Sequence, residues 1–145
     1  MKKFVFSLAT LAKHKATLEK QQKAELARVM RLLNALYEEQ NQVTRAMTNN
    51  AASQERALQE QLDVLKELER HDNYHTYLRL WLEDIKGQIA PAEAEKKRIQ
   101  AVLLVIMREI KTLDRLRAEQ YQAYLAEERR EENLTLVDLI SSRYT

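Results

Sequence analysis

Near the middle of the chain, residues 70–77 read Arg70-His71-Asp72-Asn73-Tyr74-His75-Thr76-Tyr77. On either side lie long charged stretches that are rich in Leu and Ala and almost free of Gly and Pro. An apolar stripe stops just before this segment, and a second stripe begins soon after it. We therefore predict that the chain reverses at about residues 71–75. The predicted fold is all-α: a long antiparallel two-stranded coiled-coil hairpin, with a first arm at about 5–70 and a second arm at about 76–142.

The composition favours long helices over other fold classes. The 145 residues include 24 Lys and Arg and 22 Asp and Glu, but only one Gly and one Pro. Such a chain has almost no turn chemistry for a sheet or for many short helices. Its length fits one domain, residues 1–145. The absence of Cys excludes disulfides and thiolate metal sites, and the formal net charge of +2 argues against a dedicated nucleic-acid binder.

Apolar residues in both arms recur at alternating steps of three and four, which is the spacing of a coiled-coil seam. The first arm contributes Leu26, Val29, Leu33, Leu36, Val43, Met47, Leu58, Leu62, Leu65 and Leu68, and the second Leu82, Ile85, Ile89, Ala92, Ile99, Leu103, Ile106, Ile110 and Leu113. Two interruptions are expected. A kink or break is predicted at 48–53, where Thr and Asn lower helix propensity, and a kink or short non-helical joint at 87–91, where Pro91 follows Gly87.

The charges predict an antiparallel register. Residues 1–31 carry eight Lys and Arg against two Glu, whereas residues 119–132 carry five Glu against two Arg. A reversal at 71–75 would pair residues whose numbers add up to roughly 145–149, so that opposite charges meet across the arms. Lys15 would then lie near Glu131 or Glu132, Arg28 near Glu119, and Leu8 near Leu139 or Ile140. Because each exposed pair is worth only ~0–1 kcal/mol, these charges select the register more than they stabilise the fold.

Catalytic and metal chemistry are not expected. His71 and His75 stand four residues apart near Glu67 and Asp72, a spacing that could ligate a metal from one helical face. A turn at this position would break that geometry, so we expect solvated polar side chains instead. Paired Glu residues such as those at 127–128 lack an enclosed site that would separate their pKa values. We predict neither an enzyme nor a bound cofactor.

Neither a secretion signal nor a membrane span is expected. The apolar run after Lys2-Lys3 is short and is followed at once by basic residues, unlike a secretory leader. The most apolar run elsewhere, residues 102–107, is far shorter than the ~20 residues of a membrane helix. The basic first arm could contact an acidic membrane or nucleic acid, but pairing with the acidic last arm is the preferred interpretation.

Aromatic residues follow the predicted turn. Tyr74, Tyr77 and Trp81 fall at i, i+3 and i+7, on one face of a helix. They would either plug the tip of the hairpin or form a partner-binding patch, since Tyr and Trp are favoured at binding hot spots. Tyr37, the lone aromatic residue in the middle of the first arm, is open to the same two interpretations.

Residues at both ends and at the centre resemble the FliJ family, a small component of the bacterial flagellar protein export apparatus. The matching residues are Phe4-x-Phe6-x-Leu8-x-x-Leu11-x-x-x-Lys15-x-x-x-Glu19, then Asn73-Tyr74, Tyr77-Leu78 and Trp81-Leu82-x-x-Ile85, and finally Ile110-Lys111-Thr112-Leu113-Asp114-Arg115-Leu116, Glu127-Glu128-Arg129-Arg130-Glu131-Glu132, Asp138 and Arg143. The resemblance covers the whole length, in the family's order.

The resemblance implies a coiled-coil stalk similar to that of rotary ATPases. Such a protein binds the ring of the export ATPase and promotes its assembly, and it contacts the membrane-embedded export gate and substrate chaperones during flagellum biogenesis, which serves motility and chemotaxis. Tyr77, Trp81 and Gln88, together with Tyr37, match the gate-contacting positions. The resemblance also implies a cytoplasmic protein at the inner face of the cell membrane. Direct membrane insertion is not expected, and the hairpin predicts a chain that is monomeric when isolated. A virulence-type III secretion stalk and a plain structural homodimeric coiled coil are the alternatives.

Overall fold

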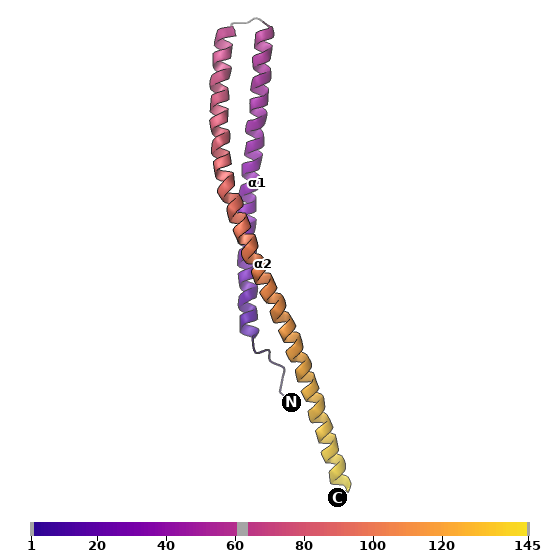
Figure 1. Cartoon of the computed structure of the whole chain (residues 1–145). Helices are drawn as coiled ribbons and strands as arrows, with labels where there is room; N and C mark the ends of the chain where they lie inside the picture. Colours follow the sequence, from indigo (N-terminus) through magenta and orange to yellow (C-terminus); the bar gives the residue numbers. More distant parts are fainter. Residues whose placement is uncertain (1, 61–63, 145) are drawn as a thin grey trace. The chain divides into compact units, whose positions relative to one another are not determined.

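The computed structural model describes residues 2–60 and 64–144. These residues form two long helices, α1 (Ala9–Gln59) and α2 (Val64–Tyr144), and no strand (Figure 1). Their sequences consist largely of Ala, Leu, Glu, Gln, Lys and Arg, the residues with the highest helix propensities. Over these described ranges, neither helix holds a stretch that is long and apolar enough to cross a bilayer.

The chain divides into two compact units. The central unit comprises Ala24–Gln100, and the terminal unit comprises Met1–Lys23 together with Ala101–Thr145. Each unit contains a segment of α1 and a segment of α2. The expectation of one domain over residues 1–145 stays a prediction.

In the central unit, α1 and α2 pack through two apolar clusters. Val29 and Leu33 pack with Ala92 and Ile99, and Leu26 and Ile89 lie against them. Farther along α1, Val43 packs with Leu78 and Ile85. Because residue numbers rise along α1 as they fall along α2, the two segments run antiparallel.

The terminal unit is held by aromatic, polar and apolar contacts. The ring of Phe4 lies 5.2 Å from that of Tyr121 and 5.5 Å from that of Tyr124, centroid to centroid. The Gln120 amide donates a hydrogen bond to the Ser7 hydroxyl at 3.1 Å, and Lys15 forms an ion pair with Glu109. This pairing is also antiparallel. The predicted all-α fold with an antiparallel helical hairpin is therefore confirmed.

Buried residues recur at steps of seven along both helices. The series is Val29, Leu36, Val43 and Asn50 in α1, and Leu78, Ile85, Ala92, Ile99, Ile106 and Leu113 in α2. A strict seven-residue repeat keeps the same face of a supercoiled helix toward its partner. Asn50 is the one polar side chain among the buried positions of the described residues.

The predicted reversal at residues 71–75 is wrong, because these residues lie within α2. The first helix instead ends at Gln59, and the antiparallel second helix begins at Val64. His71 sits seven residues before Leu78 and extends the seven-residue series as a half-buried side chain, with Asn50 of α1 as its partner. The apolar stripe is interrupted here because the polar pair of Asn50 and His71 replaces its apolar contacts. Leu58 and Leu65 of the predicted stripe are 49% and 82% exposed, and Leu62 lies outside the described residues.

The predicted charge register is wrong as well. The numbers of contacting residues add up to 121 for Asn50 and His71 and to 124 for Lys15 and Glu109, well below 145. Arg28 pairs with Glu25 of its own helix at 3.1 Å. Leu139 and Ile140 are exposed and do not cover Leu8. Exposed charges contribute too little free energy to override the packing of the seam.

Both predicted interruptions are helical. α1 continues through residues 48–53 and α2 through residues 87–91, so no break or non-helical joint is present at either place. The hydroxyl of Thr48 donates to the carbonyl of Thr44 at 3.1 Å and so does not compete for a helix-ending conformation. Pro91 leaves the carbonyl of Gly87 without its helical donor. Both residues are exposed, so water can replace that donor.

Candidate partner-binding face

Three aromatic side chains line one face of α2 in the central unit. The rings of Tyr74 and Tyr77 are stacked, with centroids 6.4 Å apart and planes 18° apart. The ring of Tyr77 lies 6.0 Å from that of Trp81 at an angle of 50°. Tyr74 and Tyr77 are 45% and 59% exposed, which is high for aromatic side chains in ring contact. The spacing of three and four residues brings the rings together, as the sequence predicted.

Trp81 connects this face to the core. Its side chain is partly buried against the cluster of Val43, Leu78 and Ile85. The indole Nε1 donates a hydrogen bond to Glu39 Oε1 of α1 at 2.8 Å. A buried tryptophan usually needs such a partner for its N–H group, and the bond fixes the orientation of the ring. Trp81 therefore anchors the two more exposed tyrosines.

Gln88 extends the same face of α2. It stands seven residues after Trp81, about two helical turns farther along. Its side-chain amide donates to Asp84 Oδ2 at 3.0 Å, and Gln88 is exposed. We call Tyr74, Tyr77, Trp81, Asp84 and Gln88 the aromatic face. It joins three ring systems to a polar end with free hydrogen-bonding capacity, a combination suited to binding a protein surface.

Tyr37 makes a separate contact across the two helices. Its hydroxyl donates a hydrogen bond to Glu93 Oε1 at 2.6 Å, and its side chain is 40% exposed. The hydrogen bond to Glu93, then desolvation and the carboxylate charge, raise the pKa of Tyr37 above its ordinary value. None of the ring contacts among the described residues includes Tyr37. Of the four predicted gate-contacting residues, three share the aromatic face and Tyr37 does not join their ring stack.

A polar pair in the seam was missed by the sequence reasoning. The amide of Asn50 donates to the backbone carbonyl of His71 at 3.0 Å, and Asn50 Oδ1 lies 2.7 Å from His71 Nδ1. Since the amide nitrogen faces the carbonyl, the imidazole Nδ1 must be the donor in the second bond. Asn50 stands seven residues after Val43, and His71 seven before Leu78; this spacing was the available signal.

The two histidines considered for metal binding have different surroundings. His71 faces Asn50, and its Nε2 lies 3.6 Å from Glu67 Oε2, whereas His75 is exposed. Across residues 2–60 and 64–144, no three His, Asp or Glu side chains are grouped closely enough to hold a metal ion.

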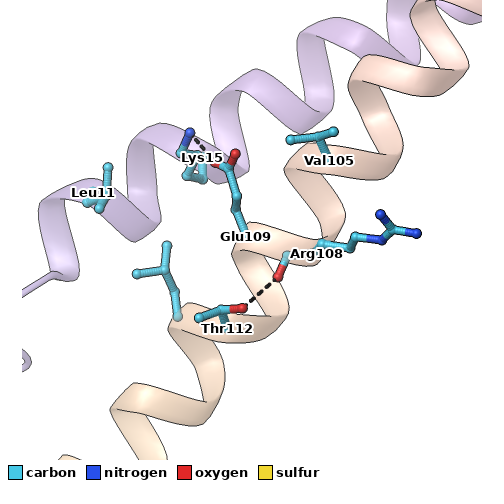
Figure 2. Close-up of a pocket in the computed structure, with 7 residues that line it drawn as sticks. Leu11, Lys15, Val105, Arg108, Glu109 and Thr112 are labelled. Carbon is cyan, nitrogen blue, oxygen red and sulfur yellow. Dashed lines mark hydrogen bonds and ion pairs between the residues drawn. The ribbon is translucent and has the colours of Figure 1, made fainter.

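A shallow groove lies between α1 and α2 in the terminal unit (Figure 2). Leu11 and Val105 give it apolar walls, and the ion pair of Lys15 with Glu109 crosses it. The hydroxyl of Thr112 donates to the backbone carbonyl of Arg108 at 3.0 Å, so it is already engaged. Such a groove suits the packing of an apolar side chain more than a chemical reaction.

No protein-family model, no curated protein and no solved structure matches this chain.

Proposed function

We propose that this protein is a non-enzymatic stalk of the flagellar type III protein export apparatus. In this role it binds the ring of the export ATPase, promotes the assembly of that ring, and links it to the export gate and to substrate chaperones. It acts in the cytoplasm, at the inner face of the cell membrane. The proposal starts from the resemblance of its end and central residues to the FliJ family.

The aromatic face is the observation that carries the proposal. The apolar residues of the seam are buried against one another, as in the contacts of Val43 with Leu78 and Ile85. Tyr74 and Tyr77 nevertheless remain 45% and 59% exposed. Exposed aromatic rings held on a rigid helix lose little conformational entropy on binding, which favours them as contact residues.

Some residues of the aromatic face support it, and others would contact the partner. Trp81 is fixed by Glu39 and by the core, so it orients the face. Tyr77 and Gln88 project more freely and would contact the export gate directly. Tyr37, held by Glu93 on the neighbouring helix, would add a contact from α1. The charged outer surfaces of both helices would face the interior of the ATPase ring.

Mixing the protein with the flagellar export ATPase of the same organism tests the stalk role. ATPase activity should rise, and the fraction of ATPase hexamers should increase in sedimentation. The ATPase of a virulence-type system from the same organism, where one exists, is the comparison that separates the two export systems. If neither ATPase changes its activity or its assembly state, the proposal is wrong.

Substitutions on the aromatic face test the gate contact. Tyr77→Ala should weaken binding to the cytoplasmic domain of the gate by more than about tenfold while far-UV circular dichroism stays unchanged. Trp81→Ala should reduce both gate binding and thermal stability, because it also loses its core contacts. Leu32→Ala, at a 46% exposed position of α1, is the matched control and should alter neither. Equal gate binding by Tyr77→Ala and by the control would remove Tyr77 from the contact.

A further inference from the structure

The C-terminal end of α2 is exposed on every side. Among the described residues, the hydrogen bonds and ring contacts between the start of the chain and α2 reach as far as Tyr124, whose hydroxyl donates to the carbonyl of Lys2 at 2.8 Å and whose ring lies against Phe4. Beyond that point, every described residue from 129 to 144 is exposed. The apolar residues among them, Leu134, Leu136, Val137, Leu139 and Ile140, are each 52–59% exposed.

Most of these apolar residues do not continue the seam between α1 and α2. Seven-residue steps from Gln120 and Tyr124 reach Glu127, Glu131, Leu134 and Asp138, of which three are carboxylates. Leu136, Val137, Ile140 and Tyr144 share a different face, which we call the tail face. At about 100° per residue, Ile140 points roughly 160° away from Tyr124. A longer or shifted α1 would leave this face uncovered.

The edge of the tail face carries its own complementary charges. Glu132 and Arg143 lie eleven residues apart, close to three full turns, and so project from the same edge near opposite ends of the face. In an antiparallel pair of identical helices, the same edges meet. If partner residue numbers add up to about 276, Glu132 approaches Arg143 of the second copy at both ends, and Leu136 faces Ile140. A parallel pair would instead bring opposite edges together, so Glu132 would not meet Arg143 of the second copy.

We propose that the tail face binds a second copy of this chain in antiparallel orientation. The apolar side chains Leu136, Val137 and Ile140 form the centre of the contact, and the two Glu132–Arg143 pairs fix its register. The paired length, residues 132–143, corresponds to about 18 Å of helix. A contact of that length buries far less surface than the about 1,600 Å² of a standard interface. The association is therefore weak, and the chain is monomeric at low concentration. This contact is independent of the proposed role in export.

A charge-reversal series tests the contact. In sedimentation equilibrium over a wide concentration range, the unaltered chain should show a concentration-dependent dimer. Glu132→Arg and Arg143→Glu should each weaken that association at least about tenfold, and the double variant should restore it to within about twofold. Asp138→Arg changes the net charge as much as Glu132→Arg does but lies off the tail face, so it should leave the association unchanged. Circular dichroism must show equal helicity for all variants.

Single cysteines test the orientation, because the chain contains no Cys of its own. In a mixture of Val137→Cys and Ile140→Cys chains, an antiparallel pair gives mainly disulfides between the two different variants. A parallel pair gives disulfides between identical variants and would overturn the proposal. A chain that stays monomeric at every concentration, or a double charge reversal that restores nothing, would overturn it equally.

Discussion

At the scale of single residues, the Asn50–His71 pair specifies how α1 is aligned with α2. Asn50 is 7% exposed and uses both ends of its amide on one residue of the other helix. A buried polar side chain is tolerated only where its partners are present. The pair is therefore satisfied in one alignment of α1 against α2, which is how a buried Asn specifies register in coiled coils.

Replacing Asn50 measures that role. Asn50→Ala should lower the free energy of unfolding by about 1–3 kcal/mol, because it leaves the His71 carbonyl and imidazole without their partner. Urea denaturation followed by circular dichroism gives this value. Asn49→Ala, at the neighbouring exposed position, is the control and should stay within about 0.5 kcal/mol of the unaltered chain. A loss at Asn50 no larger than at Asn49 would mean that the pair does not stabilise the fold.

Tyr37 gives the fold a pH dependence at alkaline pH. The hydrogen bond to Glu93 raises the pKa of Tyr37 above its ordinary value of about 10. A raised pKa in the folded state stabilises the fold below the unfolded pKa, and this stabilisation is lost as the pH rises through the folded pKa. Between pH 8 and pH 11 the unaltered chain should lose more stability than Tyr37→Phe, as judged from urea midpoints. Parallel losses in the two proteins would contradict this assignment.

At the scale of the helices, the continuity of α2 through Gly87 and Pro91 has a cost. A proline inside a helix costs about 3 kcal/mol and a glycine about 1 kcal/mol relative to alanine. The neighbours of Pro91 compensate by packing: Ile89 lies against both apolar clusters of the central unit, and Ala92 is buried in one of them. Tertiary contacts thus override local propensity, which is usual in long helices.

Alanine substitutions should recover this cost. Pro91→Ala should raise the free energy of unfolding by up to about 3 kcal/mol, since it restores a helical hydrogen bond to the Gly87 carbonyl. Gly87→Ala should raise it by about 1 kcal/mol, because a Cβ at that position meets no atom within 4 Å. Chemical denaturation with matched m-values is the measurement. A destabilised Pro91→Ala would indicate that the packing of the central unit requires the proline.

At the scale of the whole molecule, the alignment of α1 with α2 is the property that needs a direct test. In the central unit, Ser53 and Arg70 line one shallow pocket together with Asn50 and His71. Ser53→Cys with Arg70→Cys should therefore be joined efficiently by a short bis-maleimide reagent. Ser53→Cys with Ala94→Cys, the pairing that the charges suggested, should not be joined, since Ala94 lies about 36 Å along α2 from Arg70. Efficient linkage of the second pair, seen by mass spectrometry, would contradict the register.

The sequence predicts the helical class and most members of the seam from the spacing of the apolar residues, and the antiparallel arrangement from a single reversal near the middle of the chain. It does not predict the alignment. An apolar seam with a strict repeat packs almost equally well after each shift of seven residues, and exposed charges such as Arg28 add too little to choose among these shifts. The polar His71 belongs to the seam although it interrupts the apolar stripe, and the apolar Leu65 fits the stripe although it is 82% exposed.

For the candidate site, the sequence likewise predicts the grouping within one helix but not the partners on the other helix. The grouping of Tyr74, Tyr77 and Trp81 follows from the helical period, so the sequence predicts it. The carboxylates Glu39 and Glu93, which hold Trp81 and Tyr37, come from the opposite helix in each case. They can be identified only once the alignment is known.

The Asn50–His71 pair also has a mechanical consequence. Two helices with the same repeat can slide past each other in steps of one heptad, about 10.5 Å, and regain apolar contacts after every step. One such step would set Asn50 against Leu78 or His71 against Val43, and each would leave a polar side chain of the seam without its hydrogen-bond partner. The hydrogen bonds of the pair therefore resist sliding of one helix along the other. Under a pulling force, the two helices of the central unit should separate in one abrupt event. A chain with Leu at both positions should instead slide gradually, one heptad at a time.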